Sequence, residues 1–97
     1  MKLNILECNL CGDKIFSRAN HDYRYCSCEN IFVDGGNYFP DDEIFSFYRY
    51  GGKGNTFKHG TVELEVTEKE LYDDWNKSTD AYGIIKCMKP HHKDKVC

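Results

Sequence analysis

The spacing of apolar residues in the second half of the chain predicts two long strands. Residues 61–66 alternate between polar and apolar side chains, as in a strand with one buried face. The inward set is Val62, Leu64 and Val66, and the outward set is Glu63 and Glu65. Residues 44–50 are β-branched or aromatic almost throughout, which indicates a strand covered on both faces. Since residues 51–55 are rich in glycine, we expect the two strands to form one long β-hairpin.

Shorter strands separated by turns are expected in the first 40 residues. The candidate strands are residues 13–17, 23–25 and 31–33. The sequence Asp34-Gly35-Gly36-Asn37 follows the third strand and is typical of a turn, because glycine and asparagine tolerate a positive φ.

A short helix is predicted after the hairpin. Thr67 and Glu70 have the spacing of a capping box, and the helix is expected to end near Lys77. Its buried face would hold Leu71 and Trp75, one turn apart, and its outer face Asp73 and Asp74. Residues 82–88 then predict a last strand, which Pro90 ends.

Length and composition exclude several classes of protein. The 97 residues fit one small domain, and 40% of them are hydrophobic, which argues against disorder. No apolar run approaches the ~18 residues of a membrane span. Asn4 and Glu7 interrupt the apolar core that a signal peptide would need. We therefore expect a cytoplasmic protein, in which cysteines stay reduced and bind metal rather than form disulfides.

Four cysteines predict a metal site. Cys8 and Cys11 are separated by two residues, and Gly12 permits the left-handed backbone that such a turn needs. Cys26 and Cys28 form a tighter pair that can also chelate. Two such turns joined by strands predict one structural Zn²⁺ held by four thiolates, as in a zinc ribbon, with no open position for catalysis. Iron remains an alternative, because four thiolates can hold either metal.

These elements together predict an α+β fold that is mostly β. It combines a zinc-ribbon-like N-terminal half with a long β-hairpin, one short helix and a final strand. We expect residues 1–40 to form the ribbon-like subdomain and residues 41–88 an extension packed on it as one domain. Residues 89–97 would form a basic tail.

Other candidate ligands are weaker. His21 lies between the cysteine pairs, but we expect it to cap a turn or to donate to a thiolate. Asp22 and Asp34 are expected to accept backbone N–H bonds in their turns. A second metal site is an open alternative at the C-terminus, where the possible ligands are Cys87, His91, His92 and Cys97.

Several motifs together resemble a family of short, uncharacterised zinc-ribbon proteins encoded mostly by bacteriophages and prophages. The motifs are Cys8-x₂-Cys11-Gly12-Asp13, Ser17, His21-Asp22-Tyr23, Cys26-x-Cys28 and Val33-Asp34-Gly35-Gly36 followed by Tyr38. The resemblance covers residues 5–50 and implies a four-cysteine metal site and a phage setting, but no activity. The chain departs from the family after Cys28, where Asn30 is a candidate for the left-handed position usually held by glycine.

Charge is distributed unevenly along the chain. The formal net charge is -3, and residues 61–80 contain 2 Lys and 7 Asp or Glu. We expect six carboxylates to form an acidic, partner-binding surface: Glu63, Glu65, Glu68, Glu70, Asp73 and Asp74. Such a surface suits a basic groove, because opposite charges steer the encounter.

The absence of a catalytic constellation predicts that the chain is not an enzyme and has no small-molecule substrate or membrane partner. The preferred hypothesis is a phage-type inhibitor or modulator that binds a host protein, for example a nucleic-acid-binding one, in anti-defence such as anti-CRISPR or in host takeover. The alternative is a nucleic-acid-binding zinc ribbon that serves transcription or replication. It would use Arg18, Arg24 and Arg49 with Tyr23, Tyr25, Tyr48 and Tyr50.

Overall fold

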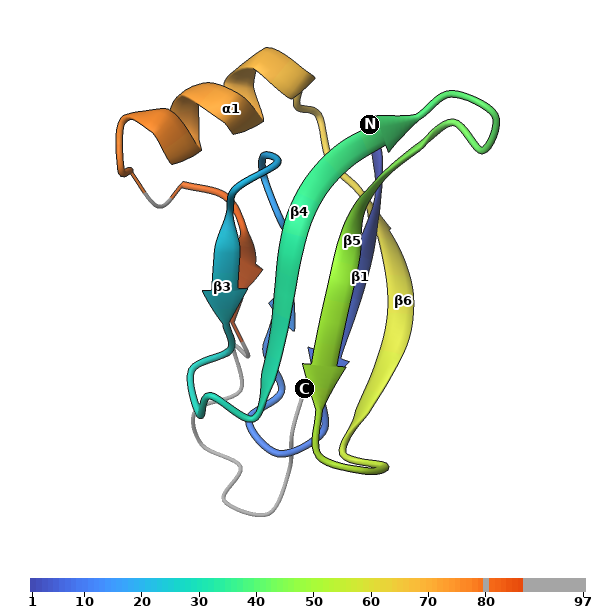
Figure 1. Ribbon diagram of the computed structural model, residues 1–97, viewed down its shortest axis with the longest axis vertical. Coiled ribbons are helices and arrows are strands. Elements are labelled where there is room, and N and C mark those ends of the chain that lie inside the picture. Colours follow the sequence, from blue (N-terminus) through green and yellow to red (C-terminus); the bar gives the residue numbers. More distant parts are fainter. Residues whose placement is uncertain (80, 87–97) are drawn as a thin grey trace.

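A curled sheet with one helix across its end makes up the computed structural model, which describes residues 1–79 and 81–86 (Figure 1). The strands are β1 (Lys2–Cys8), β2 (Lys14–Ile15), β3 (Tyr23–Tyr25), β4 (Ile31–Phe39), β5 (Ile44–Gly52), β6 (Phe57–Glu63) and β7 (Ile84–Ile85), and the helix is α1 (Glu68–Asn76). The prediction of a mostly β protein with one short helix is confirmed. The predicted tail, residues 89–97, lies outside the described residues.

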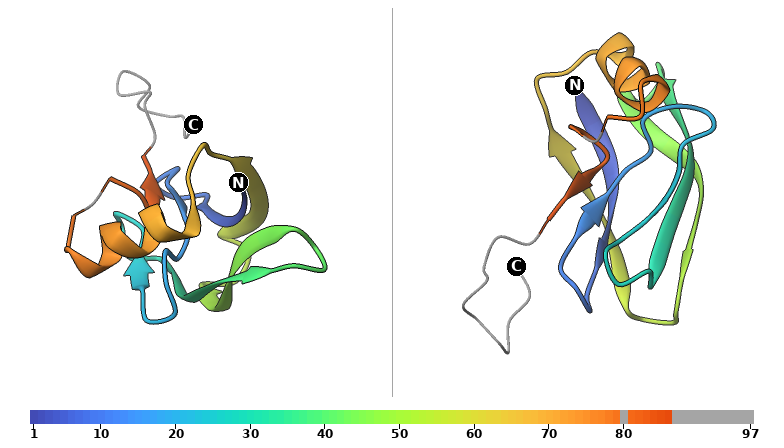
Figure 2. Two further views of the ribbon diagram at one scale, coloured as in Figure 1. Left: turned by 90° about the horizontal axis from the view of Figure 1, so that it is seen from above. Right: turned by 90° about the vertical axis from the view of Figure 1, so that its left-hand side faces the viewer.

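Strand β1 is the centre of the sheet, because it pairs along both edges. One edge is antiparallel to β6 over its full length. The other edge is shared by β5, which pairs in parallel at Leu3↔Phe45, and by β2, which pairs antiparallel at Leu6↔Ile15. The order is β3-β4-β5-β1-β2-β7, with β6 also on β1. The sheet curls until β7 approaches β3 (Figure 2), and Lys86 Nζ donates to Ser27 Oγ at 3.1 Å.

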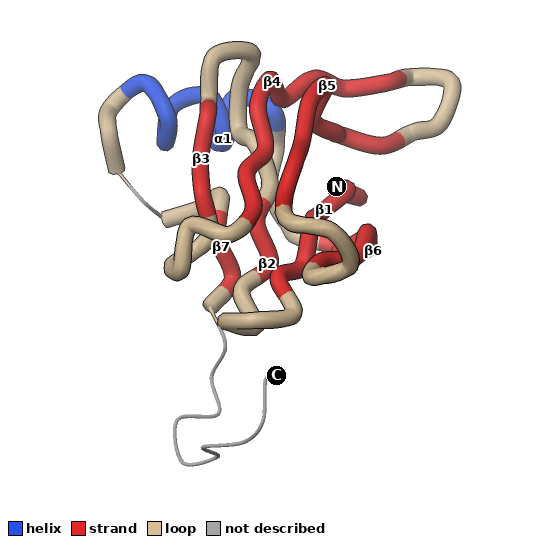
Figure 3. Tube along the Cα trace, turned by 60° about the horizontal axis from the view of Figure 1, so that its bottom comes forward, coloured by secondary structure: helices blue, strands red, loops and turns tan. Residues whose placement is uncertain are grey.

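The long hairpin is formed by β4 and β5, so the prediction of a hairpin from β5 and β6 is wrong. Strands β4 and β5 pair antiparallel from Ile31↔Gly52 to Phe39↔Ile44. Strand β6 pairs with β1 instead, from Lys2↔Glu63 to Cys8↔Phe57 (Figure 3). Glycine-rich residues 51–55 allow the chain to turn, but they do not determine which strand β6 then pairs with.

The predicted turn at residues 34–37 does not form. Strand β4 continues through it, because Gly35 takes a φ of +81° inside the strand while the register on β5 stays unchanged on both sides. The chain reverses later, at Pro40–Glu43, where the N–H of Glu43 donates to the carbonyl of Pro40 at 3.2 Å. Glycine here permits a bend in a strand rather than a reversal.

Only the first half of β5 is covered on both faces. Ile44, Phe45 and Phe47 are buried, but Tyr48 and Tyr50 are 56% and 47% exposed. The reason is that Tyr48 and Tyr50 lie on the face of β5 opposite to Phe45 and Phe47, since successive side chains of a strand point to alternate faces.

The core has two parts. One lies between β1, β2, β4 and β5 near the cysteines and contains Leu6, Cys8, Ile15, Cys26, Ile31, Val33 and Phe47. The other lies beneath α1 and contains Leu3, Ile5, Phe16, Phe45, Val66 and Leu71. The predicted alternation of residues 61–66 is confirmed, because the three apolar residues are buried or half-buried and both glutamates are exposed.

Gly36 should be intolerant of a side chain. A Cβ at this position would lie 2.5 Å from the carbonyl oxygen of Ser17 and 2.7 Å from the ring of Phe45. Because backbone must move to relieve this clash, we expect Gly36→Ala to lower the free energy of unfolding by about 2 kcal/mol in urea titrations. Gly60→Ala is the matched control, since its Cβ would meet only the flexible end of Ile5, at 3.1 Å. Equal effects of the two substitutions would contradict this explanation.

Candidate metal centre

Two cysteine turns meet at the end of the sheet opposite α1 (Figure 1). Cys8 ends β1, Cys11 lies in the turn that follows, and Cys26 and Cys28 lie in the turn between β3 and β4. The four sulfur atoms all lie within 4.8 Å of one another. Cys28 Sγ is 3.6 Å from both Cys8 Sγ and Cys26 Sγ. Thiolates around one tetrahedral metal lie about 3.8 Å apart, from a metal–sulfur distance of about 2.3 Å, so the cluster fits a metal ion.

The first turn is shaped by Gly12. Its φ of +81° lets its N–H return to the carbonyl of Cys8 at 2.9 Å. The N–H of Leu10 donates to Cys8 Sγ at 3.3 Å. The turn therefore presents two sulfur atoms on one side and directs a backbone dipole at one of them, as the sequence predicted for Gly12.

The second turn is shaped by Glu29 rather than by Asn30. Glu29 takes the left-handed conformation, with a φ of +62°, so the prediction that Asn30 replaces the usual glycine is wrong. Asn30 instead points its side-chain amide into the site. Its Nδ2 donates to Thr56 Oγ1 at 2.7 Å and lies 3.7 Å from Cys8 Sγ. Asn30 thereby links the second turn to the first and to the segment before β6.

Asp13 is a site residue that the sequence reasoning missed. It is 3% exposed, and its Oδ2 accepts the N–H of Ser27 at 2.8 Å, so a side chain of the first turn holds the backbone of the second. The available signal was the position of a carboxylate directly after Cys11-Gly12. A buried carboxylate there needs donors, and an adjacent metal-binding turn supplies backbone N–H groups.

The environment of the thiols separates their pKa values. Burial opposes ionisation of Cys8, but N–H groups of Cys11 and Leu10 outweigh it and lower its pKa to about 7. Burial raises the pKa of Cys11 to about 12 and also raises that of Cys28. Without a cation the thiols of Cys11 and Cys28 therefore stay protonated at neutral pH. A bound metal displaces their protons, and its binding free energy then stabilises the folded state.

The other candidate ligands lie elsewhere. His21 is exposed and its ring centroid is 6.3 Å from that of Trp75, so it is not part of the cysteine cluster. Asp34 forms an ion pair with Arg49 across β4 and β5. The possible second site formed by Cys87, His91, His92 and Cys97 lies outside the described residues.

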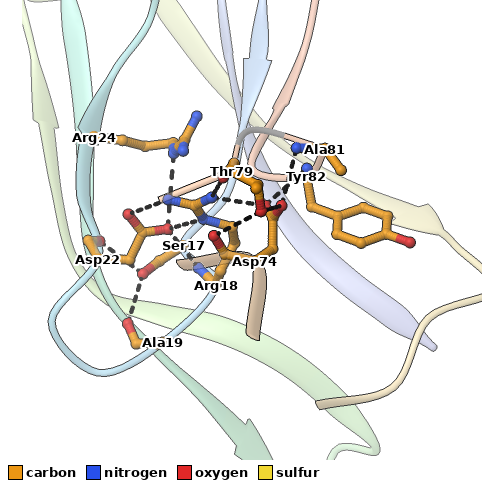
Figure 4. A network of polar contacts seen from close by, with 9 residues as sticks. All are labelled: Ser17, Arg18, Ala19, Asp22, Arg24, Asp74, Thr79, Ala81 and Tyr82. Atoms are coloured by element: carbon orange, nitrogen blue, oxygen red, sulfur yellow. Dashed lines mark hydrogen bonds and ion pairs between the residues drawn. The ribbon is translucent and has the colours of Figure 1, made fainter. Parts of the chain in front are cut away.

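A buried ion-pair network joins α1 to the segment between β2 and β3 (Figure 4). Arg18 is 6% exposed, and its Nε and Nη2 contact the two carboxylate oxygens of Asp22 at 2.8 and 3.2 Å. Its Nη1 contacts Asp74 Oδ2 at 2.6 Å. The prediction that Asp74 points away from the core is therefore wrong. Its partner Arg18 lies 56 residues earlier in the sequence, and helical periodicity gives no information about a contact over that separation.

Asp74 is held ionised inside this network. Burial alone would raise its pKa, but hydrogen bonds from Thr79, Arg18 and the N–H groups of Tyr82 and Ala81 lower the pKa to about 2. Arg18 also donates to the carbonyl of Thr79 at 2.7 Å. The network thus fixes both the helix and the segment that follows it. As expected, Asp22 does accept a backbone N–H, from Arg18 at 2.8 Å.

The other carboxylates predicted to form the acidic surface are not part of this network, and some of them contact neighbouring residues of α1. Glu63, Glu65 and Glu68 are exposed. Glu70 completes the capping box with Thr67, which confirms that prediction, and Asp73 pairs with Lys69 at 2.9 Å. The structure adds three carboxylates that the sequence reasoning did not include. Asp41, Asp42 and Glu43, in the loop between β4 and β5, line one groove with Lys2 and Glu63.

The residues named for nucleic-acid binding are divided between interior and surface. Tyr23, Tyr25, Tyr48 and Tyr50 are all about half exposed. Arg18 is buried in the network described above, and the Nε of Arg24 lies 3.7 Å from Asp22. Arg49 is exposed beside Asp34. The aromatic part of this set is therefore accessible, whereas much of its positive charge is neutralised.

The single described helix is too short and too polar to cross a membrane, and no candidate span occurs in residues 1–79 and 81–86. No curated protein and no solved structure matches the chain. Residues 1–40, which contain all four clustered cysteines, match the model of an uncharacterised family, described as a domain of unknown function (DUF7695).

Proposed function

We propose that this protein is a zinc-stabilised binding module of the phage type, which attaches to a basic host protein in the host cytoplasm and inhibits or modulates it. In this role zinc is structural. Four sulfur ligands leave a tetrahedral ion no open position, and the turns around them are fixed by backbone and side-chain hydrogen bonds. The metal then secures one end of the sheet, and binding takes place at the other.

The observation that carries this proposal is the gathering of carboxylates at the end opposite the cysteines. We call this surface the acidic end and define it by exposed residues of three segments: Asp41, Asp42, Glu43, Glu63, Glu65 and Glu68. The loop between β4 and β5, the end of β6 and the start of α1 all lie at that end (Figure 1). Segments far apart in sequence thus present like charge together. The nearby cations are Lys2, Lys69 and the N-terminal amine of Met1, which lies 3.0 Å from Glu63 Oε2.

A basic groove is the partner surface that fits the acidic end. Exposed carboxylates repel nucleic acid and attract lysine- and arginine-rich surfaces, and they raise the rate of association more than the final affinity. A host protein with a groove for DNA or RNA offers such a surface. Occupation of that groove would inhibit it, which is the expected mode of an anti-defence protein such as an anti-CRISPR.

Charge reversal at the acidic end tests the proposal. The variant carries Asp41→Lys, Asp42→Lys, Glu63→Lys and Glu65→Lys, which leaves the capping box of Thr67 and Glu70 intact. A host protein captured by the wild-type chain from nuclease-treated lysate should associate with the variant at least tenfold more slowly at low salt. The matched control, Lys53→Glu with Lys58→Glu, reverses exposed charges outside the acidic end and should leave capture unchanged. Equal capture by both variants would contradict the acidic end as the binding surface.

A nucleic-acid-binding module is the second candidate, and one surface favours it. The rings of Tyr23 and Phe32 stack with centroids 5.1 Å apart at 11°, and Tyr25 lies beside them at 5.3 Å from Tyr23. Exposed aromatic rings can stack on the bases of a single strand. The same capture experiment, run with and without nuclease, distinguishes the two candidates. Captured material that is lost after nuclease treatment but still binds the charge-reversal variant would support the nucleic-acid module.

A further inference from the structure

A cavity of about 460 Å³ lies between α1, the segment that links β2 to β3, and β4. Its volume falls within the range of ligand pockets, roughly 300–1,000 Å³. Its lining combines rings with a few polar groups, chiefly His21, Asn37, Phe45, Glu68, Tyr72 and Trp75. Glu68, Tyr72 and Trp75 follow one stripe of α1, because they are spaced by four and three residues. The cavity adjoins the acidic end through Glu68.

The rings of the cavity are tilted toward one another rather than packed flat. Trp75 is central, with its centroid 5.6 Å from that of Tyr72 at 53° and 6.3 Å from that of His21 at 38°. Tyr72 is 48% exposed and His21 is exposed, so the rings are accessible from outside. Aromatic faces set at angles around an opening attract cations through their quadrupoles, and tryptophan does so most strongly.

The charges of the lining also favour a cation. Arg18 is neutralised by Asp22 and Asp74, and Lys69 is paired with Asp73 at 2.9 Å. Within the described part of the chain, no residue forms an ion pair with Glu68. The carboxylate of Glu68 is therefore available to pair with a cationic ligand. The side-chain carbonyl of Asn37 offers a further hydrogen-bond acceptor.

We propose that this cavity receives an arginine side chain of the basic partner. This inference rests on the proposed function, because a partner attracted by the acidic end presents such side chains. Arginine fits better than lysine, because its planar guanidinium stacks on an aromatic face and forms two parallel hydrogen bonds with a carboxylate. Trp75 and Tyr72 would contact the guanidinium plane, and Glu68 would bind its edge.

Trp75 allows a direct test, because it is the only tryptophan in the chain and gives one indole N–H signal in a ¹H–¹⁵N spectrum. The probes are N-acetyl-arginine amide and N-acetyl-citrulline amide, which have nearly the same shape but differ in charge. We expect saturable shifts of the indole signal by the arginine probe at pH 8, with a dissociation constant of roughly 1–10 mM, and at least tenfold weaker binding of the citrulline probe.

Three variants connect this binding to the named residues. Glu68→Gln and Tyr72→Ala should each weaken binding of the arginine probe about three- to tenfold. Circular dichroism checks that each variant keeps the fold. Glu7→Gln is the matched control, because Glu7 lies in β1 outside the acidic end and does not line the cavity, and it should leave binding unchanged. Equal binding of both probes, or none, would overturn the inference. Binding of uridine monophosphate in place of arginine would assign the cavity to a nucleotide and overturn it as well.

The outcomes also separate this inference from the proposed function. If charge reversal at the acidic end abolishes capture of the host protein while neither probe shifts Trp75, the proposed function stands and the arginine cavity is rejected. If the arginine probe binds but charge reversal leaves capture unchanged, the cavity stands and the acidic end is rejected as the docking surface.

Discussion

Removal of a bound metal should unfold the end of the sheet that carries the cysteines, because Cys8 and Cys26 belong to the core at that end and the metal would link the two cysteine turns. Structural zinc sites contribute on the order of 10 kcal/mol at neutral pH, which is comparable to the whole stability of a domain of this size. We expect a strong chelator, or the substitution Cys26→Ser, to abolish cooperative thermal unfolding. Elemental analysis should find one metal per wild-type chain and none in the variant.

The matched control for this prediction is Cys87→Ser, since Cys87 lies outside the two cysteine pairs of the sequence. It should keep one metal per chain and the wild-type melting temperature. Substitution of Co²⁺ identifies the ligands, because the visible spectrum of a tetrahedral four-thiolate site differs from that of a site with fewer sulfurs. A metal-free protein that keeps its strand signal and its melting transition would contradict a structural metal.

Arg18→Met should be the most destabilising substitution away from the cysteines. It leaves Asp22 and Asp74 buried and without the guanidinium that both contact within 2.8 Å. Loss of one partner from a buried network costs about 3–5 kcal/mol, because the remaining charge stays desolvated. Urea unfolding at pH 7 measures the loss. Arg49→Met is the matched control, since Arg49 and Asp34 pair at the surface and the change should be close to undetectable.

The destabilisation by Arg18→Met should depend on pH in a defined direction. In the wild-type protein the folded pKa of Asp74, about 2, lies below its ordinary value of 3.8. The stability that this carboxylate contributes is therefore complete above about pH 5 and is lost as the pH falls from about 4 to about 2. Without Arg18 the pKa of Asp74 rises, so the folded variant takes up a proton at a higher pH. The difference between variant and wild type should narrow as the pH falls from 7 toward 4, and a constant difference would contradict this account.

The two cysteine pairs of the cluster could be predicted from the sequence because the geometry of each pair is local. Cys8 and Cys11 are brought together by one turn and Gly12, and Cys26 and Cys28 by another. The capping box of Thr67 and Glu70 and the alternation of residues 61–66 are equally local, and both predictions hold. Short-range spacing acts through bond rotations and hydrogen bonds of neighbouring residues, so it needs no knowledge of the remaining fold.

Strand pairing could not be predicted from the same signals. The glycines at residues 34–37 look like a turn, yet the tertiary contacts of β5 and Ser17 keep the chain extended through Gly35 and Gly36. Strand β6 follows β5 in sequence but pairs with β1, because a free strand edge is a property of the assembled sheet.

The sequence by itself determined that this is a mostly β protein with one capped helix and four cysteines placed to share one ion. Only the tertiary structure decided that Asp74 is paired inside rather than exposed, that Asp13 and Asn30 link the two cysteine turns, and that Asp41, Asp42 and Glu43 line one groove with Glu63 at the end of β6. The physical reason is how far apart in the sequence the interacting residues lie. Spacing along a chain records interactions within one or two turns, whereas a buried ion pair or a shared surface depends on residues that only folding brings together.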